Sequence, residues 1–175
     1  MNKGQYTLWF TGLSGSGKTT IAKGLAKRLR KEGHSILVID GDDARKFISY
    51  DLGYSIHERD KHITRIAGVC YLATANNIMS IACVLSPTRR IRGYARRLIG
   101  KFIEIHIKCP IEVCAERDVK GFYKKIENGT LTNFVGIDIP YEKPLRPEIT
   151  VDTDKETVSE SIDVIMNYLK ERKII

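Results

Sequence analysis

The feature that most constrains this chain is a glycine-rich stretch near its beginning, which lies between a β-rich run and a segment with helical spacing. Residues 12–19 read Gly-Leu-Ser-Gly-Ser-Gly-Lys-Thr and match G-x-x-x-x-G-K-[ST] at every fixed position. Residues 6–11 are rich in aromatic and β-branched side chains, and residues 18–30 repeat apolar side chains every three to four positions. This order of strand, loop and helix predicts a phosphate-binding loop in a parallel α/β fold.

The loop also predicts what it binds. Its glycines allow consecutive backbone N–H groups to converge on phosphate oxygens, and the helix N-terminus adds the positive end of its dipole. We expect Lys18 to reach the β- and γ-phosphates and Thr19 to bind Mg²⁺, so the predicted ligand is a nucleoside triphosphate with magnesium. The residues of the predicted triphosphate site are Gly12, Leu13, Ser14, Gly15, Ser16, Gly17, Lys18 and Thr19.

The rest of the chain alternates apolar strands with helices, a pattern typical of a parallel sheet covered on both faces. Strands are predicted at residues 6–11, 35–39, 78–85, 102–107 and 149–152, and helices at 18–30, 58–75, 89–99, 111–117 and 158–170. We therefore predict a P-loop NTPase-type three-layer α/β sandwich with a parallel sheet of about five strands. A length of 175 residues favours a single domain over residues 1–175.

Residues 119–147 break this alternation. They are polar, poorly periodic and punctuated by glycine and proline. A segment this long inside a compact domain is commonly a mobile lid, and an ordinary surface excursion is the alternative. We predict a lid.

Composition and charge exclude several classes of protein. An apolar content of 42% with 5 prolines is not that of a disordered chain, and no apolar run reaches the ~18 residues of a membrane span. The first residues show no signal-peptide pattern, so we expect a cytoplasmic protein without a membrane partner. The 4 cysteines lack metal-ligand spacing and are expected to be free thiols. A net charge of +8 favours anionic partners.

Two carboxylates indicate the class of reaction. Asp40 ends the apolar run of residues 35–39, where a second magnesium ligand is expected, and Asp42 follows two residues later. The guanine-specific pattern N-K-x-D is absent from the sequence. A small domain with a phosphate loop, these carboxylates and a polar lid predicts a small-molecule kinase. A nucleotide-binding switch without turnover remains the alternative.

Eight segments, in order along nearly the whole chain, resemble the adenylylsulfate kinase family. They are Gly12–Thr20, Asp40-Gly41-Asp42-x-x-Arg45, Asp51–Ser55, Arg59, Ser86-Pro87-x-Arg89-x-x-Arg92, Glu116–Asp118, Lys120–Lys125 and Asn133–Glu142. The resemblance implies that ATP, with Mg²⁺, phosphorylates the ribose 3′-hydroxyl of adenylylsulfate and that the products are 3′-phosphoadenylylsulfate and ADP. It also implies a homodimer.

The resemblance assigns roles by position. Asp42 would orient or deprotonate the 3′-hydroxyl, Asp40 and Thr19 would serve the metal, and Lys124 would close over the phosphates beside Lys18. Thr20 and Arg117 join the ATP site. The implied acceptor residues are Asp42, Arg45, Tyr54, Arg59, His62, Ser86, Arg89, Arg92, Lys124 and Phe134, with Tyr54 and Phe134 on either side of the base. Plainer interpretations remain open: Asp40 as a helix N-cap, Arg45 and Arg59 as helix-surface residues, and the two aromatics as core.

Five arginines gather within residues 89–97. We expect Arg89 and Arg92 to guide the substrate, and Arg90 and Arg97 to face solvent or a partner subunit. A nucleic-acid surface is the alternative, but no aromatic interleaving or recognition motif accompanies the cluster, so no nucleic-acid partner is predicted.

Three positions depart from the family pattern. His62 stands for an asparagine of the acceptor pocket, Thr64 for an arginine and Thr88 for a tyrosine. The departures lie on the acceptor side, whereas the ATP side is intact. Two acceptors therefore remain: adenylylsulfate, and cytidine diphosphoramidate of bacterial capsule pathways, with the same 3′-phosphoryl transfer. We expect adenylylsulfate because the other acceptor residues are retained.

Overall fold

The computed structural model describes residues 5–118 and 121–175, and its framework is one parallel sheet. The strands are β1 (Thr7–Thr11), β2 (Ile36–Asp40), β3 (Met79–Cys83), β4 (Phe102–Lys108) and β5 (Ile149–Asp152), in the spatial order β2-β3-β1-β4-β5. Thr7 of the central strand pairs with Ser80 on one side and Phe102 on the other. Because all pairs are parallel, the strands' carboxyl ends meet at one edge.

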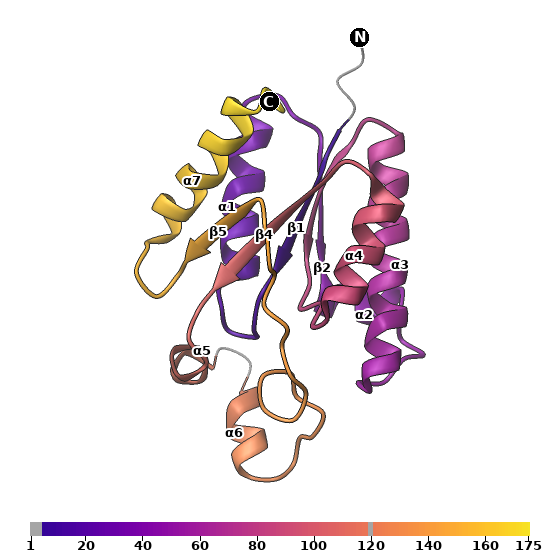
Figure 1. Cartoon of the computed structure of the whole chain (residues 1–175), viewed down its shortest axis with the longest axis vertical. Helices are drawn as coiled ribbons and strands as arrows, with labels where there is room; N and C mark the ends of the chain where they lie inside the picture. The colour runs from indigo at the N-terminus through magenta and orange to yellow at the C-terminus, as the bar shows by residue number, and fades with distance from the viewer. Residues whose placement is uncertain (1–4, 119–120) are drawn as a thin grey trace.

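Helices cover both faces of the sheet (Figure 1). One face carries α1 (Lys18–Lys31) and α7 (Val158–Glu171), and the other carries α3 (Ile56–Ala75) and α4 (Arg89–Ile99). The alternation of side chains along β1 explains this: Leu8 and Phe10 belong to the core under α1 and α7, whereas Trp9 belongs to the core under α3 and α4. The predicted three-layer α/β sandwich and its five strands are confirmed.

Three short helices lie near the carboxyl edge of the sheet: α2 (Gly41–Phe47), α5 (Ile111–Arg117) and α6 (Phe122–Glu127). α2 directly continues β2, and Asp40 caps it by accepting a hydrogen bond from the Asp42 N–H. α3 begins with a reciprocal cap between Ser55 and Glu58, which ends the α2–α3 loop firmly. Neither α2 nor α6 was expected, because each is short and its mostly polar sequence shows no helical repeat of apolar residues.

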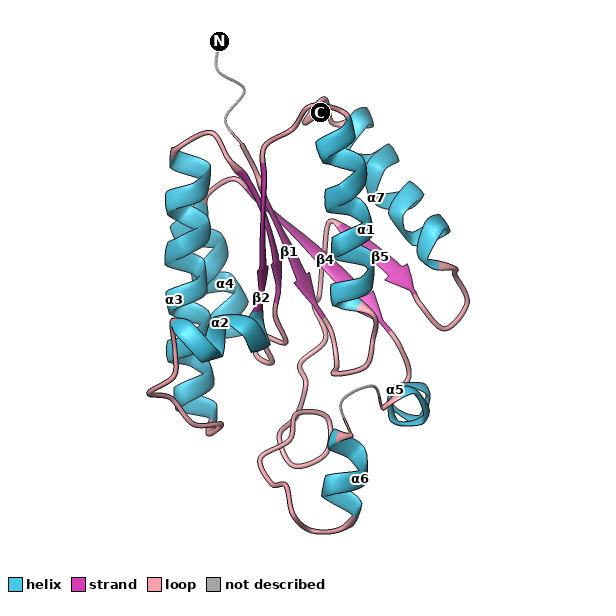
Figure 2. Ribbon diagram, turned by 180° about the vertical axis from the view of Figure 1, so that it is seen from behind, coloured by secondary structure: helices cyan, strands magenta, loops and turns pink. Residues whose placement is uncertain are grey.

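The predicted lid, residues 119–147, is described except for Val119 and Lys120, which lie outside the described residues. α6 and the loop that follows it hang below the sheet, as both views show (Figure 2). A small cluster of Cys114, Tyr123 and Phe134 packs this segment against α5.

Within residues 5–118 and 121–175, none of the helices combines the length and apolar character that crossing a membrane requires.

Candidate active site

A pocket of about 580 Å³ opens at the carboxyl edge of the sheet. The phosphate loop lies at one end of it, followed by the turn from β2 into α2. The start of α3, the end of β3, the end of α5, the start of α6, the loop around Phe134 and the segment from β5 into α7 form the rest of the wall. Parallel sheets bind ligands at this edge because their helices begin and their loops converge there.

The phosphate loop is shaped by glycines that no other residue can replace without strain. Gly15 and Gly17 have φ values of +81° and +95°, and a Cβ at Gly15 would lie 2.8 Å from the carbonyl oxygen of Cys114. Gly17 precedes α1, whose N-terminus receives no side-chain cap from the described residues. The first N–H groups of α1 and its positive dipole end therefore suit an anion.

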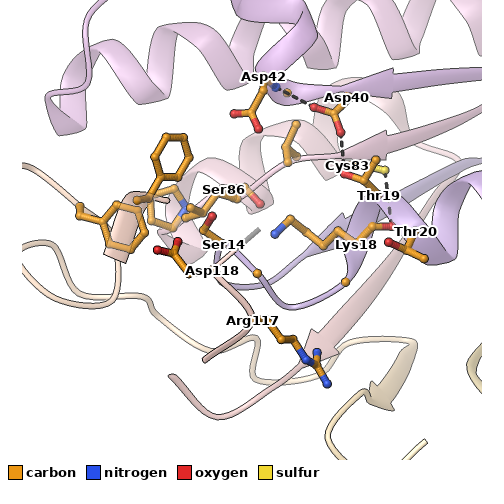
Figure 3. Close-up of a pocket in the computed structure, with 18 of the residues that line it drawn as sticks. Ser14, Lys18, Thr19, Thr20, Asp40, Asp42, Cys83, Ser86, Arg117 and Asp118 are labelled. Carbon is orange, nitrogen blue, oxygen red and sulfur yellow. Dashed lines mark hydrogen bonds between the residues drawn. The ribbon is translucent and has the colours of Figure 1, made fainter. Parts of the chain in front are cut away.

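Lys18 lies folded back across the loop. Its Nζ donates hydrogen bonds to the carbonyl oxygens of Gly12 and Leu13, at 2.9 and 2.7 Å. In Figure 3 its side chain extends over the pocket. Gly12, Leu13 and Ser16 themselves are not among the residues that line the cavity, so within the described residues they shape the loop from behind.

Asp40 connects the loop to α2. Its Oδ2 accepts a hydrogen bond from Thr19 Oγ1 at 2.6 Å, and its Oδ1 accepts one from the Asp42 N–H at 2.9 Å (Figure 3). Asp40 is thus both a helix N-cap and the partner of the phosphate-loop threonine, so capping α2 does not exclude the predicted metal role. The Asp42 side chain lines the same pocket.

Two arginines enclose an exposed tyrosine at the other end of the pocket. The guanidinium carbons of Arg45 and Arg59 lie 4.5 and 5.3 Å from the centre of the Tyr54 ring. Arg45 donates to the Gly53 carbonyl at 2.7 Å, and Arg59 donates to the carbonyls of Tyr54 and Asn133 at 2.9 and 2.8 Å. Burial lowers the pKa of both guanidinium groups, but an arginine stays charged at neutral pH. Two cations are therefore held beside an aromatic ring.

The other predicted acceptor aromatic has a different environment. Phe134 is 6% exposed and packs edge-on against Tyr123, with ring centres 5.0 Å apart. Tyr54 is 54% exposed. Both rings line the pocket, so Phe134 is part of a small core and part of the wall.

His62 is the only one of the three departures from the family pattern that lines the pocket in the described structure. Its Nδ1 lies 2.9 Å from Ser49 Oγ, and burial, with help from the charges of Arg45 and Arg59, lowers its pKa to about 4. His62 is therefore neutral at physiological pH. Thr64 donates to the Asp60 carbonyl in its own helix, and Thr88 caps α4 by accepting from the Ile91 N–H. Local hydrogen bonds account for both threonines.

The structure does not bring every predicted residue to the pocket. Arg89 and Arg92 lie outside it, and Arg92 is only 3% exposed because its guanidinium is bound by Glu104 and by backbone carbonyls. That these two arginines guide the substrate stays a prediction: Arg89 is exposed, Arg92 is buried, and neither belongs to the described pocket wall. Lys124 is exposed and is likewise absent from the described lining. Arg90 pairs with Asp60.

Some lining residues were missed by sequence reasoning. The Tyr123 hydroxyl donates to the Ser14 carbonyl at 3.0 Å, and Thr153 Oγ1 donates to the Ser16 carbonyl at 2.9 Å, so both support the loop. Arg117, which was predicted, donates to the Thr153 carbonyl at 2.6 Å. Thr153 directly follows β5, and its position just after a strand end was the available signal.

A phosphate loop after the central strand, a threonine–carboxylate pair and a second, cationic end of the same pocket define a phosphate-loop kinase that transfers a phosphoryl group to a small acceptor. The family model of adenylylsulphate kinase matches residues 4–152. The chain belongs to this family.

Individual relatives agree. The adenylyl-sulfate kinase of Clostridium acetobutylicum is 48% identical over 169 residues, which cover 96% of this chain and 84% of the relative. That of Halothermothrix orenii is 44% identical over 174 residues, 99% of this chain and 94% of the relative. The structure of the Mycobacterium tuberculosis APS kinase CysC in complex with AMPPNP and APS matches with a TM-score of 0.92 and 32% identity, over 95% of this chain and 98% of that one.

Proposed function

We propose that this protein transfers the γ-phosphoryl group of ATP to the ribose 3′-hydroxyl of adenylylsulfate, and that the products are 3′-phosphoadenylylsulfate and ADP. The observation that carries the proposal is the single pocket shared by the phosphate loop and the Arg45–Tyr54–Arg59 cluster. The β2–α2 turn touches both ends: Asp40 holds Thr19 of the loop, and α2 carries Asp42 and Arg45.

Each end suits one substrate. The loop N–H groups, Lys18 and the start of α1 suit the ATP phosphates, with Thr20 and Arg117 also on the pocket wall. Arg45 and Arg59 suit the phosphosulfate of the acceptor because a guanidinium pairs with two anionic oxygens at once. Tyr54 and Phe134 offer aromatic faces to its base. Asp42 would align the 3′-hydroxyl and accept its proton.

Magnesium fits the Thr19–Asp40 pair. A hydroxyl and a carboxylate 2.6 Å apart are hard oxygen donors, and Mg²⁺ is usually held by one or two such groups together with substrate phosphates. Consistent with that mode, the described residues contain no cluster of three or more His, Cys, Asp or Glu that could hold a metal by itself. When bound, the ion would neutralise charge on the transferring phosphate.

Adenylylsulfate is favoured over the cytidine compound by the placement of the departures. Thr64 and Thr88 satisfy backbone groups of their own helices, and neither is part of the described pocket wall. Of the three departures, His62 is the one that lines the described pocket. Its neutral imidazole, like the family's asparagine, is an uncharged hydrogen-bonding group.

Residues 119–147 are proposed to act as the lid, although Val119 and Lys120 lie outside the described residues. The support is that Lys124 is exposed and away from the pocket, whereas the neighbouring Tyr123 and Phe134 touch the pocket wall. A rotation of this segment toward the loop would bring the Lys124 cation onto the phosphates.

We also propose a homodimer in a reducing, cytoplasmic setting. α3 and α4 pack together, and each exposes large apolar side chains: Tyr71 and Leu72 on α3, and Tyr94 and Leu98 on α4. Burying such side chains against a second copy would stabilise a dimer. All four cysteines are free, and burial raises the pKa of Cys70 and Cys83 to about 12, which makes these thiols unreactive. Sedimentation would measure the oligomeric state.

The experiment that tests the function is ADP release by the purified chain with ATP, Mg²⁺ and each acceptor in turn at matched concentration. We expect rapid release with adenylylsulfate and little with cytidine diphosphoramidate or without acceptor. If ADP is released with cytidine diphosphoramidate and not with adenylylsulfate, the proposed acceptor is wrong. If ADP is released equally with and without an acceptor, the protein is an ATPase or a switch.

A further inference from the structure

One wall of the acceptor end has an unusual backbone. Ser86, which lines the pocket just after β3, has a φ value of +40°, a conformation that residues other than glycine rarely adopt (Figure 3). Its hydroxyl points into the protein: it accepts from Trp9 Nε1 at 3.2 Å and donates to Thr11 Oγ1 at 3.0 Å. Such a conformation persists only where the surroundings hold it.

Arg92 is the group that holds this wall from behind. It projects from α4, and its Nη1 donates to the Ser86 carbonyl at 2.6 Å. Its Nη2 donates to the Glu142 carbonyl at 2.5 Å, and its Nε lies 2.8 Å from Glu104 Oε1 on β4. One planar guanidinium thus joins the pocket wall, the sheet and the chain that returns from residues 121–141.

The returning chain is bound to the same wall at Glu142. The Glu142 N–H donates to the Pro87 carbonyl at 2.9 Å, and its carboxylate accepts from the Arg89 N–H at 2.6 Å. The preceding residue, Tyr141, places its hydroxyl 3.0 Å from Thr11 Oγ1. The far end of the proposed lid and the acceptor wall are therefore parts of one hydrogen-bonded unit centred on Arg92.

We propose that Arg92 is a positioning residue for phosphoryl transfer, which fixes the Ser86–Pro87 wall of the acceptor site and anchors the segment before β5 to it at Glu142. Arg92 does not touch substrate, since it is buried and lies outside the pocket. Its effect passes through the two carbonyl oxygens that it joins. The inference rests on the proposed function, because the acceptor is the molecule that this wall meets.

The test compares Arg92→Lys with wild type by steady-state kinetics, varying adenylylsulfate at saturating ATP and then ATP at saturating adenylylsulfate. Lysine keeps a cation near Glu104, but its single ammonium cannot reproduce the planar fork that joins Ser86 and Glu142. Loss of charge-assisted hydrogen bonds in a buried site predicts a fall of about tenfold or more in kcat/KM for adenylylsulfate. We expect the KM for ATP to change by less than about twofold, since the substitution leaves the residues of the phosphate loop unchanged.

A second variant guards against simple unfolding. Arg92→Met combined with Glu104→Gln removes both charges of the buried pair, because a lone buried carboxylate by itself destabilises a fold. This double variant should show the same fall in kcat/KM for adenylylsulfate, with the KM for ATP again nearly unchanged. Arg97→Lys, on the exposed side of the same helix, is the matched control and should behave as wild type.

The outcomes separate this inference from the function on which it rests. If wild type does not phosphorylate adenylylsulfate, the proposed function fails. If wild type is active and both Arg92 variants lose thermal stability without a change in either KM or in kcat, Arg92 only supports the fold and the inference fails. An equal rise in the KM values for ATP and adenylylsulfate would also overturn it.

Discussion

The phosphate-loop end of the pocket and its acceptor end are built in different ways. The loop end comes from one continuous stretch, residues 12–19, which the side chains of Asp40, Tyr123 and Thr153 support by hydrogen bonds. The acceptor end takes Arg45 from α2, Tyr54 from a loop, Arg59 and His62 from α3, and Ser86 and Phe134 from distant segments. A local site depends on its own backbone, whereas an assembled site depends on how several elements pack. Substitutions should therefore act differently at the two ends.

The largest effect is expected at the loop. Lys18→Ala removes the cation beside the transferring phosphate, and turnover should fall about 10²- to 10³-fold with the fold retained. Lys27→Ala, on an exposed position of the same helix, is the matched control. Steady-state ADP release together with circular dichroism makes the measurement. Near-normal turnover in the folded Lys18 variant would contradict the role of the loop.

Asp42 lies where the two ends meet, and it should affect chemistry more than binding. For Asp42→Asn we expect kcat to fall about 10²-fold, with little change in the KM for ATP. Asp40→Asn should instead raise the Mg²⁺ concentration that is needed for half-maximal activity, because Asp40 holds Thr19. A magnesium titration of both variants distinguishes them. If Asp42→Asn keeps its kcat, Asp40 becomes the candidate for the proton.

At the acceptor end the loss should appear in one substrate alone. Arg59→Lys keeps the charge but loses the fork that contacts Tyr54 and Asn133, so the KM for adenylylsulfate should rise about tenfold and that for ATP should not. The control is Arg65→Lys. Arg65 lies on the same helix as Arg59 but outside the described pocket wall, and it pairs with Asp51 of the preceding loop. A parallel rise in both KM values would mean that the two ends are not independent.

The same contrast explains what the sequence could predict. The phosphate loop and the five strands could be predicted from local pattern, because glycine spacing and periodicity indicate them. The expected roles of Lys18 and Thr19 rest on the same local pattern. The environment of Arg92 could not be predicted, because its charge and helical spacing suggest an exposed face whereas its side chain is buried. Glu104 on β4 pairs with Arg92, and Glu148, just before β5, pairs with Arg96. Only packing reveals which arginines are already occupied.

A smaller effect concerns pH and stability. The pKa values of His62 and His106 are lowered to about 4 by burial, below the ~6.5 of an unfolded histidine. Between these values the unfolded chain binds more protons, so stability is full above about pH 6.5 and is lost as pH falls toward 4, by at most ~1.4 kcal/mol per pH unit for each histidine. Denaturant melts at several pH values measure the free energy of unfolding. For His62→Asn this free energy should change less with pH than for wild type, and the control variant His57→Asn, at an exposed position, should match wild type. Identical slopes in all three proteins would contradict this assignment.

The smallest change is expected in acceptor choice itself. If His62 serves as an uncharged equivalent of asparagine, His62→Asn should change kcat/KM for adenylylsulfate by less than about threefold, well under the tenfold that 1.4 kcal/mol represents. A large gain with adenylylsulfate, together with a loss on cytidine diphosphoramidate, would show that His62 selects another acceptor.

The most direct measurement is the identity of the product. The purified chain is incubated with ATP, Mg²⁺ and adenylylsulfate, and phosphorus NMR locates the new phosphoryl group while ADP is counted. The account predicts one equivalent of ADP for each new phosphate, with every new phosphate on the ribose 3′-oxygen of adenylylsulfate. ADP formed without a phosphorylated acceptor, or a phosphate at another position, would contradict it.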